Sequence, residues 1–288
     1  MISSATIRRI REHPALRQIR IFGRVVATLC WTLLLLPIQT VTAATGQGLA
    51  EKLPRLYHAG LCRILGIEVS VVGSPVTLRP ALFVANHSSW MDILVLGCLV
   101  ECSFIAKAEV GRWPGVGLLA RLQRTEFVER SRQRTNVHAA GIQRRLDEQS
   151  RLVIFPEGTS TDGSYVLPFK SSLFTSVERP ANCAGPIVQP VTVAYVMING
   201  EIATQQTRPA VAWYGDMTFA PHFLGVLQLT GIAVRVTFHD PAPEAVCHSR
   251  KTLARYCERV VVAEHARLIG GASSNQSSQP SMCIDDSG

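Results

Sequence analysis

Residues 82–96 read Leu82-Phe83-Val84-Ala85-Asn86-His87-Ser88-Ser89-Trp90-Met91-Asp92-Ile93-Leu94-Val95-Leu96. The four apolar residues at the start have the length and composition of a buried strand, and the apolar residues at the end continue as a helix. In α/β folds, ligands bind where a strand ends and the next helix begins. The polar turn between the two runs is therefore the expected position of a functional site.

Within this turn His87 and Asp92 are five residues apart. In a single helix that spacing would rotate the two side chains about 140° apart, off a common face. We therefore expect His87 in the turn and Asp92 in the first helical turn, reaching back to one ring nitrogen. A carboxylate on Nδ1 fixes the tautomer and leaves Nε2 free to accept a proton from a hydroxyl. The same interval recurs at His239 and Glu244, so spacing alone does not establish a base.

From residue 67 onward, short β-rich runs alternate with helical patterns. The alternation predicts an α/β fold: a single domain with a largely parallel sheet flanked by helices. Strands are predicted at 68–72, 82–85, 103–106, 126–129, 152–155, 187–195, 211–214 and 232–238. Helices are predicted at 91–99, 113–122, 135–149, 170–177 and 244–268.

Composition agrees with one packed domain. The 288 residues are 47% hydrophobic and 17% charged, which excludes a wholly disordered chain. The eight cysteines are scattered, without a C-x-x-C pair or a histidine at metal-ligand spacing, so we expect neither a disulfide framework nor a zinc site. Several lie in apolar runs, where reduced thiols pack as small hydrophobic groups. Reduced thiols favour a catalytic domain that faces the cytoplasm.

The N-terminal region predicts membrane association. Residues 1–24 hold six arginines against one glutamate, and residues 25–50 contain no charged side chain. A basic cluster beside an apolar run is typical of a segment that binds a bilayer with anionic lipids. Nucleic acid is not an expected partner, because no basic stripe interleaved with aromatics and no nucleic-acid module is present. A cleaved signal peptide is the alternative, although the basic arm is long for one.

The topology of this region stays open at this stage. A single span with the arginines inside would place the rest of the chain outside the cytoplasm, against the reduced thiols. A re-entrant pair, in which residues 52–65 return as an amphipathic helix, avoids this conflict. We expect a basic arm at 1–24, membrane-associated helices at 25–66, a catalytic domain at 67–269 and a disordered tail at 270–288. The expected location is the inner (cytoplasmic) membrane.

A second candidate stretch, residues 152–160, is another β-rich run broken by a proline. Gly158 allows close approach of the backbone, so its N–H groups with Thr159 could hold an anion or a polar head group. Glu157 fits beside a hydroxyl or an arginine better than beside an anion.

Four blocks in order resemble the glycerolipid acyltransferase family typified by 1-acylglycerol-3-phosphate acyltransferase, with coverage from about residue 67 to 238. The first, residues 86–92, matches the N-H-x-x-x-x-D block. The others are Phe127-Val128-Glu129-Arg130, Phe155-Pro156-Glu157-Gly158-Thr159-Ser160 and Val188-Gln189-Pro190-Val191. The third block is one position shorter than F-P-E-G-T-x-S, and Glu129 stands where many members have Asp. Each block alone is a weak signal, whereas their conjunction is specific.

The resemblance implies a role for each matching residue. His87 would be the general base and Asp92 the acid that orients it, and the acceptor's polar head would lie against Lys107, Arg130, Glu157, Gly158 and Thr159. It also implies direct acyl transfer from an acyl-CoA or acyl carrier protein thioester, without a metal or a bound cofactor. We expect the oxyanion to meet backbone N–H groups at the start of the adjacent helix.

Three functions follow from the resemblance. The first is acylation of the free hydroxyl of 1-acylglycerol-3-phosphate. The second is acylation of lyso-ornithine lipid, because residues 162–174 and Trp213-Tyr214-Gly215-Asp216-Met217 are similar to the bacterial branch that uses this phosphate-free acceptor. Asp216 could then meet the ornithine ammonium. The third is an inactive lipid-binding protein with the same fold.

Overall fold

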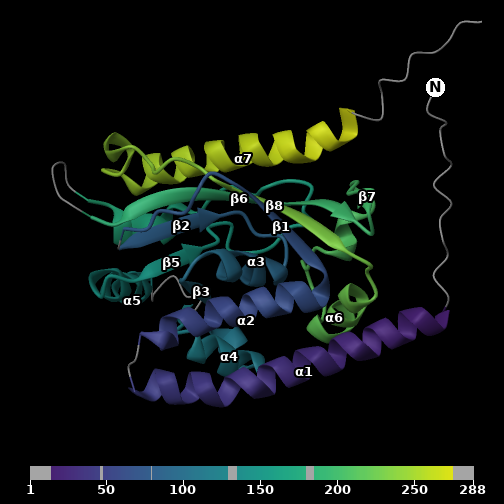
Figure 1. Cartoon of the computed structure of the whole chain (residues 1–288). Coiled ribbons are helices and arrows are strands. Elements are labelled where there is room, and N and C mark those ends of the chain that lie inside the picture. The colour runs from purple at the N-terminus through teal and green to yellow at the C-terminus, as the bar shows by residue number, and fades with distance from the viewer. Residues whose placement is uncertain (1–13, 46–47, 79, 129–134, 180–184, 275–288) are drawn as a thin grey trace, which may run out of the picture.

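The structure, a computed structural model, describes residues 14–45, 48–78, 80–128, 135–179 and 185–274 (Figure 1). Within these residues the strands form one eight-stranded sheet in the order β1-β8-β6-β2-β5-β3-β4, with β7 paired to β6. The strands are β1 (Ile67–Val72), β2 (Ala81–Ala85), β3 (Ser103–Lys107), β4 (Glu126–Val128), β5 (Arg151–Ile154), β6 (Ile187–Ile198), β7 (Glu201–Ile202) and β8 (Ile232–Phe238).

The centre of the sheet is parallel. β2 pairs in parallel with β5 and β6, and β3 pairs in parallel with β4 and β5, whereas β6 runs antiparallel to β7 and β8. All five residues of β2 are buried, which explains its uninterrupted apolar sequence, because a parallel strand is covered on both faces. The largely parallel sheet is confirmed. The carboxyl ends of β2, β5 and β3 therefore lie at one edge, where the residues that follow these strands can meet.

Helices cover both faces of this sheet (Figure 1). On one face α7 packs against β6, and α5 packs beside the 3-10 helix at Ser171–Val177. On the other face α3 packs against α2, and α1 forms the outermost layer against α2. The α-helices are α1 (Pro14–Thr45), α2 (Leu49–Leu65), α3 (Met91–Leu99), α4 (Val116–Leu122), α5 (Thr135–Asp147), α6 (Phe219–Leu227) and α7 (Arg250–Ser274).

The prediction of a strand at 211–214 is wrong. Residues 208–210 form a 3-10 helix, and the chain continues through 211–217 without regular structure. Val211 and Ala212 are buried, which accounts for the strand-like composition. The N–H of Trp213 donates to the carbonyl of Ser88 at 2.8 Å, so this backbone bonds to the turn at residues 86–90 rather than to a neighbouring strand.

Several helix predictions also need correction. Residues 171–177 form a 3-10 helix, not an α-helix. The helix predicted at 113–122 begins at Val116, after Pro114 and Gly115, and residues 108–112 before it form a separate 3-10 helix. The pattern at 244–268 divides into a short 3-10 helix and α7, which continues to Ser274. Residues 270–274 are therefore helical, although we expected them in a disordered tail. The rest of that expected tail, residues 275–288, lies outside the described residues. Helix α6 had no counterpart among the predictions.

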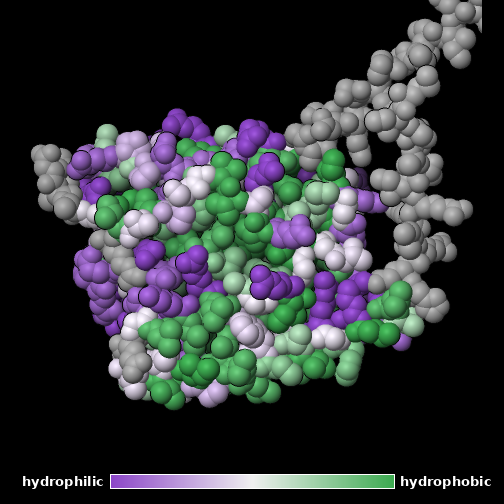
Figure 2. Space-filling view, in the orientation of Figure 1, coloured by the Kyte–Doolittle hydropathy of each residue, from purple (hydrophilic) through white to green (hydrophobic). Residues whose placement is uncertain are grey.

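Helix α1 presents a broad apolar surface to solvent. Figure 2 shows this surface as the hydrophobic band along the α1 edge of the molecule. Within the described residues, α1 is the one helix long and apolar enough to cross a membrane. Its exposed apolar side chains include Phe22, Leu29, Leu33, Leu34 and Val41.

Both ends of α1 are bonded to the α/β domain. Near its start, Arg24 donates to the carbonyls of Leu227 (3.2 Å) and Leu229 (2.6 Å), at the carboxyl end of α6. Arg20 donates to the carbonyl of the intervening Gln228 at 2.8 Å, and Arg17 bonds to the Gln228 side chain. Toward the other end, Gln39 donates to the carbonyl of Leu122 at 2.9 Å. The helix consequently lies along the domain instead of projecting away from it.

Candidate active site

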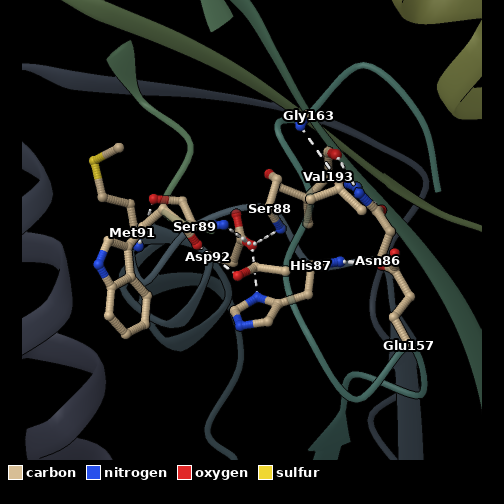
Figure 3. Close-up of polar contacts among 12 residues, drawn as sticks. Asn86, His87, Ser88, Ser89, Met91, Asp92, Glu157, Gly163 and Val193 are labelled. Carbon is tan, nitrogen blue, oxygen red and sulfur yellow. Dashed lines mark hydrogen bonds and ion pairs between the residues drawn. The ribbon is translucent and has the colours of Figure 1, made fainter. Parts of the chain in front are cut away.

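His87 and Asp92 are paired as the spacing predicts. His87 lies in the turn after β2, and Asp92 is in the first turn of α3. The Nδ1 atom of His87 is 2.9 Å from Oδ2 of Asp92 (Figure 3). The His87 side chain is 18% exposed and that of Asp92 is 0% exposed. A buried acid thus orients a histidine that remains accessible from one side.

Asp92 is held by more than the histidine. Its Oδ2 atom also accepts the N–H groups of Ser88 at 2.8 Å and Ser89 at 2.9 Å. Its Oδ1 atom accepts the hydroxyl of Tyr195, in β6, at 2.7 Å. Hydrogen bonds to an ionised carboxylate are stronger than bonds between neutral groups. Asp92 is therefore fixed in place, and the Nδ1–H tautomer of His87 leaves Nε2 as the proton acceptor.

The turn that carries His87, residues 86–90 and from here on called the catalytic turn, is fixed on both flanks. Asn86 joins it to β6, because its side chain donates to the carbonyl of Val193 and accepts the N–H of the same residue, both at 2.9 Å. The imidazole of His87 stacks on Phe155, with ring centroids 4.1 Å apart. Phe155 begins the third block, so the turn after β5 forms a wall of the site.

Glu157 is positioned differently from our expectation. It is buried, and its two carboxylate oxygens accept the N–H groups of His87 at 2.6 Å and Leu167 at 2.7 Å. Burial raises the pKa of Glu157 to about 7; these two hydrogen bonds oppose that rise, and the charge of Asp92 adds to it. In this structure Glu157 ties the third block to the catalytic turn, a contact that the sequence did not indicate.

Most N–H groups around the start of α3 are engaged within the turn, and the expected oxyanion site there stays a prediction. The N–H groups of Ser88 and Ser89 donate to Asp92, and that of His87 donates to Glu157. Met91 N donates to Ser89 Oγ, and Asp92 N donates to the Ser89 carbonyl. These five N–H groups brace the turn, which leaves the N–H of Trp90, the N-cap of α3, as the candidate donor to a reacting carbonyl.

Three of the remaining predicted residues lie at the same edge of the sheet. Lys107 ends β3, and Gly158 and Thr159 lie in the turn after β5. Gly158 has φ +67°, and a Cβ there would lie 2.5 Å from Lys170 Nζ, so glycine leaves room for that ammonium group. Arg130 lies outside the described residues.

The segment after residue 210 forms another wall; the sequence pointed to residues 213–217 but not to their contacts with the turn at residues 86–90. Trp213 accepts the hydroxyl of Ser160 at its carbonyl, at 2.5 Å, in addition to its bond with Ser88. Its ring packs edge-on against Trp113, with centroids 5.7 Å apart, and Trp113 in turn meets Phe219 of α6. The catalytic turn, the third block and α6 are thereby connected through one half-buried aromatic cluster.

The second histidine with a carboxylate five residues away is not a matching pair. The Nε2 atom of His239 is 2.9 Å from the Thr192 hydroxyl, and burial lowers the pKa of its imidazole. The interval alone therefore does not select the catalytic histidine.

A histidine oriented by a buried carboxylate at the carboxyl edge of an α/β sheet defines an enzyme that activates a hydroxyl or a water. The family described as Acyltransferase matches residues 68–194. Over 257 residues the chain is 41% identical to a lyso-ornithine lipid O-acyltransferase of Brucella abortus, covering 88% of this chain and 96% of that protein. The chain belongs to the glycerolipid acyltransferase family, and it is an acyltransferase.

More distant members share the fold. The chain is 31% identical over 210 residues to a 1-acyl-sn-glycerol-3-phosphate acyltransferase of Neisseria meningitidis, covering 71% of this chain and 77% of that protein. The crystal structure of a 1-acyl-sn-glycerophosphate acyltransferase from Thermotoga maritima matches with a TM-score of 0.59 at 20% identity, covering 87% of this chain and 97% of that one. The N-terminal apolar helix and these lipid-modifying relatives indicate association with a membrane.

Proposed function

We propose that the enzyme transfers an acyl group from a thioester to the free hydroxyl of lyso-ornithine lipid. His87 Nε2 accepts the proton as the acceptor oxygen attacks the thioester carbonyl, and Asp92 stabilises the imidazolium that forms. The proton then passes to the departing thiolate. The donor is acyl carrier protein or coenzyme A carrying the acyl chain. The paired His87 and Asp92, 2.9 Å apart, carry this proposal and argue against an inactive lipid-binding protein.

The acceptor assignment rests on the relatives and on the 211–217 segment. Lysophosphatidate, the acceptor we placed first from the motifs, becomes the second candidate, because the lyso-ornithine lipid acyltransferase is the more similar relative. Trp213 bonds to both Ser88 and Ser160, so its segment borders the site. Three residues on, Asp216 is exposed, and among the described residues no cation pairs with it. A carboxylate there favours an acceptor with an ammonium group over one with a phosphate.

A direct competition tests the acceptor. Purified enzyme is offered lyso-ornithine lipid and lysophosphatidate side by side. The donor is a labelled acyl chain, carried as a thioester by acyl carrier protein in one assay and by coenzyme A in the other. We expect kcat/KM to favour lyso-ornithine lipid, and Asp216→Asn to reduce that preference about tenfold by raising KM, since one charge pair near a surface is worth about 1 kcal/mol or more. Glu201→Gln, a change at an exposed carboxylate on β7, is the control. A preference for lysophosphatidate would refute the acceptor assignment, and inactivity on both would refute the function.

We further propose that α1 lies in the plane of the inner (cytoplasmic) membrane, with the catalytic domain on the cytoplasmic side. A helix bonded to one domain at Arg24 and again at Gln39 does not carry that domain across the bilayer. The apolar face of α1 would enter the acyl region of one leaflet, as interfacial helices do. This arrangement supports the re-entrant alternative over the single span, since α2 returns beside α1.

Labelling of intact cells tests this topology. Cysteines are introduced separately at Ser3 and at the exposed Lys251, and reaction with a membrane-impermeant maleimide is compared with the parent chain. We expect both positions to react only after the inner membrane is permeabilised, because an in-plane helix keeps them on one side. Labelling of one position alone in intact cells would support a single span. Labelling of position 251 from outside would refute the cytoplasmic orientation.

A further inference from the structure

Tyr195 lies behind the catalytic pair rather than in front of it. It belongs to β6, four residues after the final block, and its side chain is 4% exposed. Its hydroxyl donates to Oδ1 of Asp92 at 2.7 Å, across 103 residues of sequence. The other oxygen of Asp92 is already shared by His87, Ser88 and Ser89. Tyr195 thus supplies the hydrogen bond on the side of the carboxylate that faces the core.

This hydrogen bond persists over the working pH range of an enzyme. Burial first, and then the charge of Asp92, raise the pKa of Tyr195 well above its usual value. The phenol therefore remains protonated and acts as a donor. A fully buried carboxylate oxygen without a donor is costly, because it has given up its hydration without gaining a hydrogen bond. Tyr195 consequently holds the inner oxygen of Asp92 in place at this depth.

We infer that Tyr195 is a positioning residue for acyl transfer, which acts through Asp92 on the orientation and basicity of His87. The inference rests on the proposed role of His87 as base. Tyr195 is too deeply buried to touch either substrate, so its influence runs through the carboxylate. By donating to Oδ1, the phenol draws negative charge away from Oδ2, where His87 is bonded. Without the phenol, Oδ2 holds the imidazolium more strongly and the carboxylate gains freedom to rotate.

Tyr195→Phe removes only the hydroxyl, so it tests the inference with little change in packing. We expect kcat to fall about tenfold, the effect of losing a hydrogen bond to a charged group worth about 1.5 kcal/mol, with KM for both substrates unchanged. We also expect the acidic limb of the pH profile of kcat to move to higher pH, because an imidazolium that is held more tightly by Asp92 loses its proton at a higher pH.

The matched control is Tyr57→Phe. The hydroxyl of Tyr57 is 3.0 Å from Thr32 Oγ1, between α1 and α2 and outside the catalytic turn, and burial raises its pKa as well. Its loss should leave kcat and the pH profile as in the parent. If Tyr195→Phe leaves both unchanged, or lowers activity only in proportion to the folded fraction, Tyr195 has a structural role alone and the inference is wrong.

Titration of His87 by nitrogen-15 NMR gives a result that does not depend on turnover. In histidine-labelled enzyme in detergent, we expect the pKa of His87 to rise in Tyr195→Phe and to stay unchanged in Tyr57→Phe. A rise without acyl transfer to any acceptor would uphold the coupling through Asp92 while refuting the proposed function. If Tyr195→Phe leaves the titration of His87 unchanged in an enzyme that transfers acyl groups, the coupling through Asp92 is refuted and the proposed function is not.

Discussion

His87→Ala is expected to lower acyl transfer by about a hundredfold to ten-thousandfold, the range that a general base contributes. The acceptor hydroxyl is a weak nucleophile until its proton is removed, and His87 Nε2 is the group that the structure leaves available for this step. Because the imidazole is partly exposed and stacks on Phe155 at the surface of the site, its loss should change the free energy of unfolding little. The rate is measured with a labelled thioester, and folding by thermal unfolding in detergent.

His239→Ala is the matched control for this prediction. His239 also has a carboxylate five residues on, is partly buried and bonds to the Thr192 hydroxyl, yet it lies outside the proposed site. Its replacement should retain the rate of the parent enzyme. Turnover retained in His87→Ala would show that another group removes the proton, and our assignment of the base would then fail.

Local sequence predicted those parts of the structure that depend on neighbouring residues. β2, the turn and α3 follow one another within residues 81–99, and each has a strong periodic or apolar signal. The separation of His87 from Asp92 then determines which group can reach Nδ1. Parallel pairing of β2 with β5 brings the third block beside the first, as expected of an alternating α/β sequence.

Contacts across long stretches of sequence left no readable signal. The bond of Tyr195 to Asp92, the bond of Glu157 to the N–H of His87 and the bond of Trp213 to Ser88 join residues that lie 70 to 125 positions apart. The buried Val211 and Ala212 resemble a strand in composition. The next residue, Trp213, nevertheless donates its N–H to the carbonyl of Ser88 and not to a neighbouring strand. Packing against the catalytic turn outweighs strand propensity there.

The N-terminal arginines show the same limit. Their number and their position before an apolar helix predict contact with anionic lipids, and this prediction considered charge alone. In the structure Arg20 and Arg24 donate to carbonyls at the carboxyl end of α6, where the helix dipole favours cations. Part of the charge therefore joins α1 to the domain. Sequence could not indicate this use, because α6 itself was not predicted.

Replacement of Asp92 separates two functions that the wild-type carboxylate combines: its negative charge, which stabilises the imidazolium, and its acceptance of hydrogen bonds, which holds the turn. In Asp92→Asn one oxygen can keep the bonds from His87, Ser88 and Ser89, while the amide N–H₂ donates to the Tyr195 hydroxyl, which turns to accept. We expect kcat to fall about a thousandfold or more, because an imidazolium beside a neutral amide is no longer stabilised. The free energy of unfolding should change modestly, since the hydrogen bonds are retained.

Asp92→Ala should lose both catalysis and stability. It leaves the buried donors of Ser88, Ser89 and Tyr195 without their acceptor, and each such group costs about 1–3 kcal/mol. The free energy of unfolding is measured with denaturant for the parent enzyme and for Asp92→Asn, Asp92→Ala and His87→Ala. If the asparagine and alanine variants lose equal stability, the charge itself holds the turn together, and hydrogen bonding is not the main contribution. If asparagine instead keeps both fold and rate, the carboxylate only shapes the turn, and His87 acts without an anionic partner.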